Sequence, residues 1–231
     1  MANTKRTNIL TITGVLIALG TILSFVKIFE WPFGGSITLA SMVPMIIIGY
    51  KYGPRWGLFS GFAFSILQAV LGATTTQAFA GMYDAENVKG SIFRIFIMAF
   101  LDYIVAFTVL GLSGVFRDRI KNDTVAISLG GAFVVILRFA AHFVSGFLLW
   151  GEYAKDFFEG LKDTFADGGK MDAFATAITN SVLGHHEGQY LAEIYSFVYN
   201  GFYMIPELII TVIVLVVLMS IPPINRSIVK D

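Results

Sequence analysis

The chain has 231 residues, of which 56% are hydrophobic and only 14% are charged, and its formal net charge is zero. Soluble domains carry about a quarter charged residues, so a deficit concentrated into long apolar runs excludes an ordinary soluble domain and indicates a polytopic membrane protein. The zero net charge argues against a nucleic-acid partner, and the lack of cysteine excludes disulfides, thiol nucleophiles and thiolate metal sites.

Six apolar runs predict an all-α membrane protein with six transmembrane helices in a single integral membrane domain, residues 1–231. The predicted spans, in chain order, are 8–28, 37–50, 56–73, 91–115, 125–150 and 195–221. The basic start MANTKRTNIL has no convincing small-residue cleavage site after it, so the first run is predicted as a membrane helix rather than a removed signal peptide.

The polar segments between the spans predict the orientation. Basic residues near the span ends fall on one side if six spans alternate, and that side is predicted to be cytoplasmic: Lys5, Arg6, Lys51, Arg55, Arg117, Arg119, Lys121, Arg226 and Lys230. Both termini are then cytoplasmic, and the long segments 74–90 and 151–193 are extracellular. FFEGLKDTF, in the second of these, has apolar residues at helical spacing and predicts an amphipathic helix.

The fifth span carries the most informative stretch, RFAAHFVSGFLLW. Arg138, His142, Gly146 and Trp150 follow one another at intervals of four residues, so they line one stripe of a helix. Charged and polar groups at membrane depth are costly, which makes such a stripe a candidate for a ligand cavity or for pairing with an acid on another helix.

Other polar and aromatic residues are predicted at the same level of the membrane. Asp102 and Tyr103 lie in the middle or outer half of the fourth span, and Tyr195 and Asn200 lie in the first turns of the sixth. Together with the stripe they predict an outward-facing pocket in a compact bundle, for a small aromatic molecule that is cationic or amidine-like. An ion pair between Asp102 and Arg138 is a serious alternative, and both interpretations can hold together. Asn200 is also explained by hydrogen bonding between helices.

Three further features have structural alternatives. Trp31, in the loop EWPFGGS, is an interfacial anchor or a cap on a cavity. Gly14 and Ala18 allow close approach of another helix, although small residues are frequent in any membrane helix. His185 and His186 indicate a metal pair only weakly, so neither a metal site nor a cofactor is expected.

Four pieces of the chain resemble one family: PFGGSITLASMVPM, AFLDYIVAFTVLGLSGVF, RFAAHFVSGFLLWGEYA and YSFVYNGFYMIPE. These are similar to the thiamine-binding S components of energy-coupling factor (ECF) transporters. The resemblance implies a six-helix domain of the bacterial plasma membrane that captures thiamine from outside. It also implies three kinds of partner: the lipid bilayer, a coupling transmembrane subunit and two ATPase subunits. The ATPase subunits would hydrolyse ATP, so this chain is not itself expected to be an enzyme.

The resemblance also implies roles for individual residues. The family's pocket carboxylate falls at Asp102, and its other pocket-lining positions fall at Tyr103, His142, Gly146, Trp150, Tyr195 and Asn200. Trp31 is near the family's loop tryptophan, and Gly14 and Ala18 fall on its docking stripe for the coupling subunit. The outer segments 74–90 and 151–193 are longer than expected for the family.

Three other functions are considered. The chain could be an S component for a different vitamin such as riboflavin, or for a thiamine precursor. An intramembrane enzyme would use Asp102 and His142 as acid and base, but the sequence offers no second nucleophile or metal set. A purely structural subunit would leave the polar stripe as a contact between helices.

Overall fold

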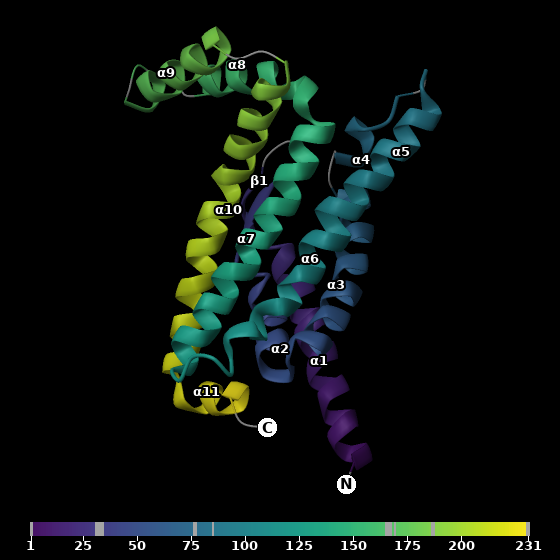
Figure 1. Ribbon diagram of the computed structural model, residues 1–231, viewed down its shortest axis with the longest axis vertical. Coiled ribbons are helices and arrows are strands. Elements are labelled where there is room, and N and C mark those ends of the chain that lie inside the picture. The colour runs from purple at the N-terminus through teal and green to yellow at the C-terminus, as the bar shows by residue number, and fades with distance from the viewer. Residues whose placement is uncertain are drawn as a thin grey trace. The chain divides into compact units, whose positions relative to one another are not determined.

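The computed structural model describes residues 2–30, 35–75, 78–84, 86–164, 168, 170–185 and 188–229. The predicted all-α membrane fold is confirmed (Figure 1). The first half of the chain contains α1 (Ala2–Ser24), β1 (Lys27–Glu30), β2 (Ser36–Thr38), α2 (Val43–Tyr52), α3 (Pro54–Thr75), α4 (Ala78–Gly81), α5 (Val88–Met98), η1 (Ala99–Val105), α6 (Ala106–Thr108) and η2 (Val109–Phe116). The second half contains α7 (Asp123–Leu149), η3 (Gly151–Tyr153), α8 (Ala154–Thr164), α9 (Lys170–His185), α10 (Gly188–Ser220) and α11 (Pro222–Val229).

Five helical stretches among the described residues are long and apolar enough to cross a membrane: Arg6–Ser24, Pro54–Thr75, Val88–Phe116, Asp123–Leu149 and Tyr190–Ser220. The predicted span 37–50 differs, because it contains β2 and then the ten-residue helix α2. At 1.5 Å per residue α2 is about 15 Å long, half the thickness of the hydrocarbon core. Hydropathy could not reveal this, since a strand and a short buried helix are as apolar as a spanning helix.

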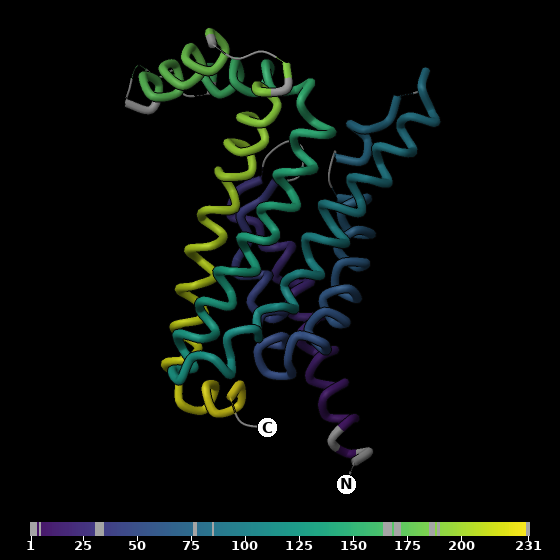
Figure 2. The backbone as a smooth tube through the Cα atoms, viewed as in Figure 1, coloured from purple at the N-terminus to yellow at the C-terminus, as the bar shows by residue number. Residues whose placement is uncertain are grey.

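The chain divides into two compact units. Unit 1 comprises Met1–Ala141 and Tyr203–Asp231, and unit 2 comprises His142–Phe202. The division falls inside α7 and inside α10, each of which runs as one continuous helix in the backbone trace (Figure 2).

Glycines bring the helices of unit 1 into backbone contact. A Cβ on Gly57 of α3 would overlap the carbonyl oxygen of Gly111 in η2, and a Cβ on Gly49 of α2 would overlap the side chain of Ser113. Ser113 is fully buried, and its hydroxyl donates a 2.7 Å hydrogen bond to the carbonyl of Ile46. Small residues at these positions let α2, α3 and η2 pack as closely as membrane helices require.

A β-hairpin joins α1 to α2, where the sequence predicts a loop and the start of a span. β1 and β2 are antiparallel, with Glu30 opposite Ser36 and Lys27 opposite Thr38. Lys27 and Glu30 form an ion pair of 2.6 Å. Trp31 lies outside the described residues, so its predicted role as an anchor or cap stays a prediction.

The third of these stretches, Val88–Phe116, which corresponds to the predicted span 91–115, is not a uniform α-helix. It begins at α5, where the side chain of Asn87 caps the helix by accepting a 3.1 Å hydrogen bond from the backbone N–H of Gly90. It then passes through the π-helix η1, which contains Asp102 and Tyr103, and ends in the 3₁₀-helix η2. π-helical turns are rare and occur often at functional sites.

Unit 2 contains a helical hairpin in the polar segment after Trp150. α8 and α9 lie side by side (Figure 1), and Thr179 of α9 donates a 2.8 Å hydrogen bond to the carbonyl of Phe158 in α8. Phe158, Leu161 and Ala175 are buried in this hairpin. The amphipathic helix predicted at FFEGLKDTF is therefore present as α8, and α10 begins at Gly188, earlier than the predicted residue 195.

Candidate functional site

A close contact between the end of α7 and the start of α10 places three of the predicted site residues together in unit 2. Gly146 is buried, and a Cβ at this position would overlap the hydroxyl of Ser196 and lie 3.2 Å from Nδ2 of Asn200. The Asn200 amide donates to the backbone carbonyls of Ser196, at 2.8 Å, and of His142, at 3.3 Å. Gly146 is therefore required by the contact between the two helices, and Asn200 is held by one hydrogen bond across the contact, to His142, and one within α10, to Ser196.

Aromatic rings collect around the start of α10. The ring of Phe157 in α8 lies 5.3 Å from that of Tyr195 and 5.6 Å from that of Tyr199, edge to face, and the two tyrosine rings are 5.5 Å apart. Trp150, which follows α7, lies 5.7 Å from Tyr153. Trp150 and Tyr195 are buried. Aromatic faces of this kind attract flat and cationic groups.

Asp102 and Tyr103 lie in unit 1, on the π-helix η1, and both side chains are half-buried. The Tyr103 ring packs 5.7 Å from Phe79 and 6.3 Å from Phe107. A Cβ on Gly72 of α3 would overlap the Tyr103 hydroxyl, so the glycine makes room for the phenol.

The side chain of Arg138, also in unit 1, contacts an aromatic ring and a thioether. Its guanidinium stacks 4.4 Å from the ring centre of Phe107 and donates to Sδ of Met42 at 2.9 Å. Glu207 and Asp102 both contribute to the electrostatic environment of Arg138. The ion pair between Asp102 and Arg138 stays a prediction, and Glu207 is a second acid near the same guanidinium.

Glu207 of α10 is the residue that the sequence analysis missed. Its side chain is 1% exposed, and its Oε1 accepts hydrogen bonds from both the backbone N–H and the hydroxyl of Thr38, the latter at 2.7 Å. Thr38 in turn lies 2.7 Å, oxygen to oxygen, from Ser41. The signal available was an acid inside an apolar run, directly after Pro206, which is expensive at membrane depth and therefore indicates a role.

The other predicted positions are placed as follows. Gly14 and Ala18 are exposed on α1, and nothing lies within 4 Å of a Cβ built on Gly14. His142 is half-buried, and its backbone carbonyl joins the Asn200 contact described above. His185 ends α9, and His186 lies outside the described residues.

Comparisons with known proteins agree on one family. The model of the family described as "Thiamine transporter protein (Thia_YuaJ)" matches residues 10–161, well over half of the chain. The curated "Thiamine transporter ThiT" of Bacillus subtilis (strain 168) is 26% identical over 220 residues, which cover 90% of this chain and 88% of that protein.

Among solved structures, ThiT from Listeria monocytogenes superposes with a TM-score of 0.60 at 22% identity, covering 95% of this chain and 98% of the other. At this identity the likeness shows a common fold. The family match extends from α1 into α8, across Asp102, Tyr103, His142, Gly146 and Trp150. The chain therefore belongs to the thiamine transporter protein family.

Proposed function

We propose that this chain captures thiamine at the outer face of the bacterial plasma membrane, as the substrate-binding subunit of an ATP-driven ECF transporter. The observation that carries the proposal is the match to the thiamine transporter family over residues 10–161, which includes six of the eight predicted substrate-binding positions. The name of the Bacillus subtilis relative, a thiamine transporter, supports the same substrate. ATP hydrolysis would belong to two separate subunits.

Thiamine carries a flat aminopyrimidine ring and a thiazolium ring with a fixed positive charge, and the chemistry of the candidate residues fits both. Trp150 and Tyr195 offer aromatic faces to the cation, and the imidazole of His142 offers a further ring. Asp102 and Asn200 offer a carboxylate and an amide to the aminopyrimidine nitrogens. Tyr103, Gly146 and Trp31 are the remaining proposed ligand positions. Hydrogen bonds between Asn200 and backbone carbonyls support this proposal, because they hold the amide in one orientation before a ligand arrives.

A coupling transmembrane subunit is the proposed partner of α1. Gly14 and Ala18 lie one turn apart on this helix, both exposed, among the exposed apolar side chains Val15 and Ile22. A small-residue stripe of this kind allows a second helix to pack closely inside a bilayer. The basic residues at the span ends support cytoplasmic termini, with the α8–α9 hairpin outside.

Tryptophan fluorescence of the detergent-purified chain tests the proposed substrate, with thiamine, riboflavin and biotin titrated in parallel. We expect saturable quenching by thiamine only, because Trp150 is a proposed ligand contact. Trp150→Phe should remove most of the quenching, whereas Trp56→Phe, a matched loss of indole outside the proposed site, should retain it.

Two results would change the proposal. A saturable response to riboflavin, with none to thiamine, would keep the transport class and replace the substrate. Silence towards all three vitamins from a protein that unfolds cooperatively would refute vitamin capture by this chain.

A further inference from the structure

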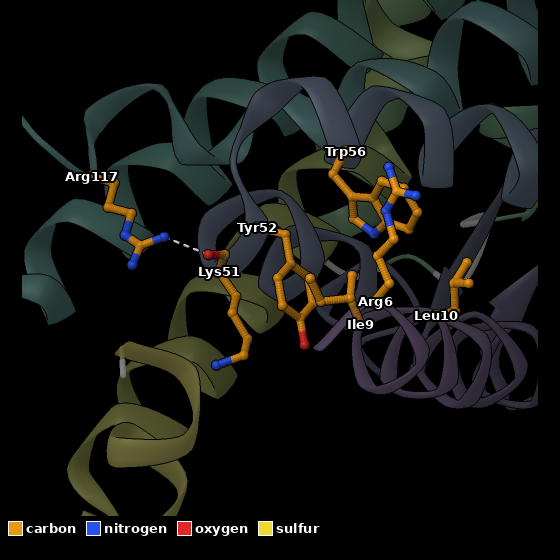
Figure 3. Close-up of a pocket in the computed structure, with 7 residues that line it drawn as sticks. All are labelled: Arg6, Ile9, Leu10, Lys51, Tyr52, Trp56 and Arg117. Carbon is orange, nitrogen blue, oxygen red and sulfur yellow. Dashed lines mark hydrogen bonds between the residues drawn. The ribbon is translucent and has the colours of Figure 1, made fainter. Parts of the chain in front are cut away.

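A pocket of about 660 Å³ lies in unit 1, and none of its lining residues is a proposed thiamine-binding residue (Figure 3). Its lining comes from the start of α1, the end of α2, the first turn of α3 and the end of η2. Seven residues line it: Arg6, Ile9, Leu10, Lys51, Tyr52, Trp56 and Arg117. Three of these are cations and none is acidic.

Two of the cations are fixed by the ends of helices. The Lys51 ammonium donates a 2.5 Å hydrogen bond to the carbonyl of Ser227 in α11. Arg117 donates to the carbonyls of Lys51, the bond dashed in Figure 3, and of Tyr50 and Val229, at 3.3 and 3.4 Å. These carbonyls belong to the last turns of α2 and α11, where a helix favours positive charge. Backbone carbonyls thus fix the positions of both cations.

The ends of the apolar stretches lead us to expect this pocket at the level where the membrane meets water. Arg6 begins the first membrane-spanning stretch, Trp56 lies in the first turn of the second, and Arg117 directly follows the third. Lys51 and Tyr52 end α2, immediately before that second stretch. Successive spans alternate in direction. The first and second stretches therefore start on the same side only if the chain returns between them, and the hairpin and α2 provide that return. The third stretch then ends on this same side.

The rest of the lining is apolar or amphipathic. Leu10 is 57% exposed, Trp56 and Tyr52 are half-buried, and the Trp56 indole N–H is held by a 2.9 Å hydrogen bond to the hydroxyl of Thr13 in α1. Tryptophan and tyrosine at a membrane surface pack their rings beside acyl chains and headgroups. A site that combines three cations with exposed apolar side chains at this depth suits an anionic amphiphile better than a free anion.

We propose that this pocket binds the phosphate-bearing headgroup of an anionic phospholipid, with Arg6, Lys51 and Arg117 facing the phosphate and Leu10 and Trp56 beside the acyl chain. Each basic residue near an anionic leaflet contributes about 1 kcal/mol to such binding. The lipid links α1 to the ends of α2 and η2. The proposal is independent of thiamine capture, because no residue of the pocket belongs to the proposed thiamine site.

The test uses acyl-chain quenching of Trp56 in a full-length chain whose other tryptophans are replaced, Trp31→Phe and Trp150→Phe. The protein is reconstituted into vesicles in which either phosphatidylglycerol or phosphatidylcholine carries brominated chains, at equal total composition. We expect brominated phosphatidylglycerol to quench Trp56 more strongly, and the ratio of quenching at varied composition gives a relative binding constant. Arg6→Gln should lower that constant about 5-fold, the effect of one basic residue.

Arg55→Gln is the matched control, since Arg55 is exposed, lies beside Trp56 and does not line the pocket. Arg6 is chosen because Lys51 and Arg117 also hold helix ends, so their substitution could unfold the protein. Equal quenching by the two lipids, or an equal loss in Arg55→Gln and Arg6→Gln, would overturn the site. Loss of the preference in excess inorganic phosphate, at constant ionic strength, would overturn the lipid as its ligand in favour of a free phosphate.

Discussion

Asp102 is a carboxylate within a membrane-spanning helix, and its position in a π-helix distinguishes it from an ordinary polar residue of a helical contact. The sequence predicted its importance, because an acid at membrane depth is costly. It could not predict the π-helix, since no residue pattern marks the extra residue per turn. Glu207 was also visible as an acid, but its partner Thr38 lies 169 residues away, so only the fold reveals the hydrogen bonds between them.

Asp102→Asn should weaken thiamine binding about 10- to 100-fold, because a hydrogen bond to a charged group is worth about 1.5–3 kcal/mol. Equilibrium binding measured by fluorescence gives the ratio of dissociation constants. Asp118→Asn, at an exposed position just beyond η2, removes the same charge and should leave binding unchanged. Wild-type affinity in Asp102→Asn would remove Asp102 from the site.

Glu207→Leu should destabilise the protein by about 1–3 kcal/mol, since the N–H and hydroxyl of Thr38 would lose a buried acceptor. Glu207→Gln keeps one acceptor oxygen of the same shape and should lose much less. Thermal unfolding in detergent compares the two variants. An equal loss of stability in both would show that the charge beside Arg138, rather than the hydrogen bonds to Thr38, is what matters.

At the scale of elements, hydropathy predicted the long helices and failed at the short ones. The spans in α1, α3, α7 and α10 lie within several residues of the predicted runs. A long apolar run in a bilayer forms a helix, because its backbone polar groups must then bond to one another. The hairpin β1–β2 and the short α2 were not, since their apolar residues are buried by tertiary packing. The α8–α9 hairpin was anticipated only at α8, because the apolar periodicity of α9 is weaker.

Gly146→Ala should destabilise unit 2 by about 1–3 kcal/mol, because the added methyl overlaps Ser196 and forces α7 and α10 apart. The Asn200 amide would move with that contact, so thiamine binding should weaken as well. Gly160→Ala on α8, where nothing lies within 4 Å of the new Cβ, should instead stabilise by about 0.5–1 kcal/mol. Unfolding midpoints measured side by side give the comparison, and equal effects at the two glycines would contradict the packing argument.

Ala18→Trp should abolish co-purification with the coupling subunit while thiamine binding stays at the wild-type level, because a large ring prevents close approach along α1. Leu19→Trp is the control: it adds a ring at an exposed position of the same helix, about 100° further round. Affinity pull-down from membranes that contain the whole transporter measures the association. A normal yield with Ala18→Trp would show that the partner docks elsewhere.

At the scale of the whole molecule, membership of the thiamine transporter protein family connects the fold with the proposed substrate. Residue patterns predicted a membrane protein with a pocket for an aromatic cation, and the resemblance of four sequence pieces narrowed this to thiamine. The family match over residues 10–161 and the fold shared with ThiT of Listeria monocytogenes confirm that assignment of family and fold. The α9 helix lies beyond the family match, and its apolar contacts with α8 could not be read from a sequence pattern.

Isothermal titration calorimetry of the purified wild-type chain with thiamine tests thiamine capture most directly, because it needs neither a partner subunit nor a reporter residue. The account predicts one thiamine per chain with a dissociation constant below about 1 µM, a binding free energy stronger than about −8 kcal/mol. Riboflavin under the same conditions should give no heat beyond dilution. A folded protein that gives no saturable heat with thiamine would contradict the account.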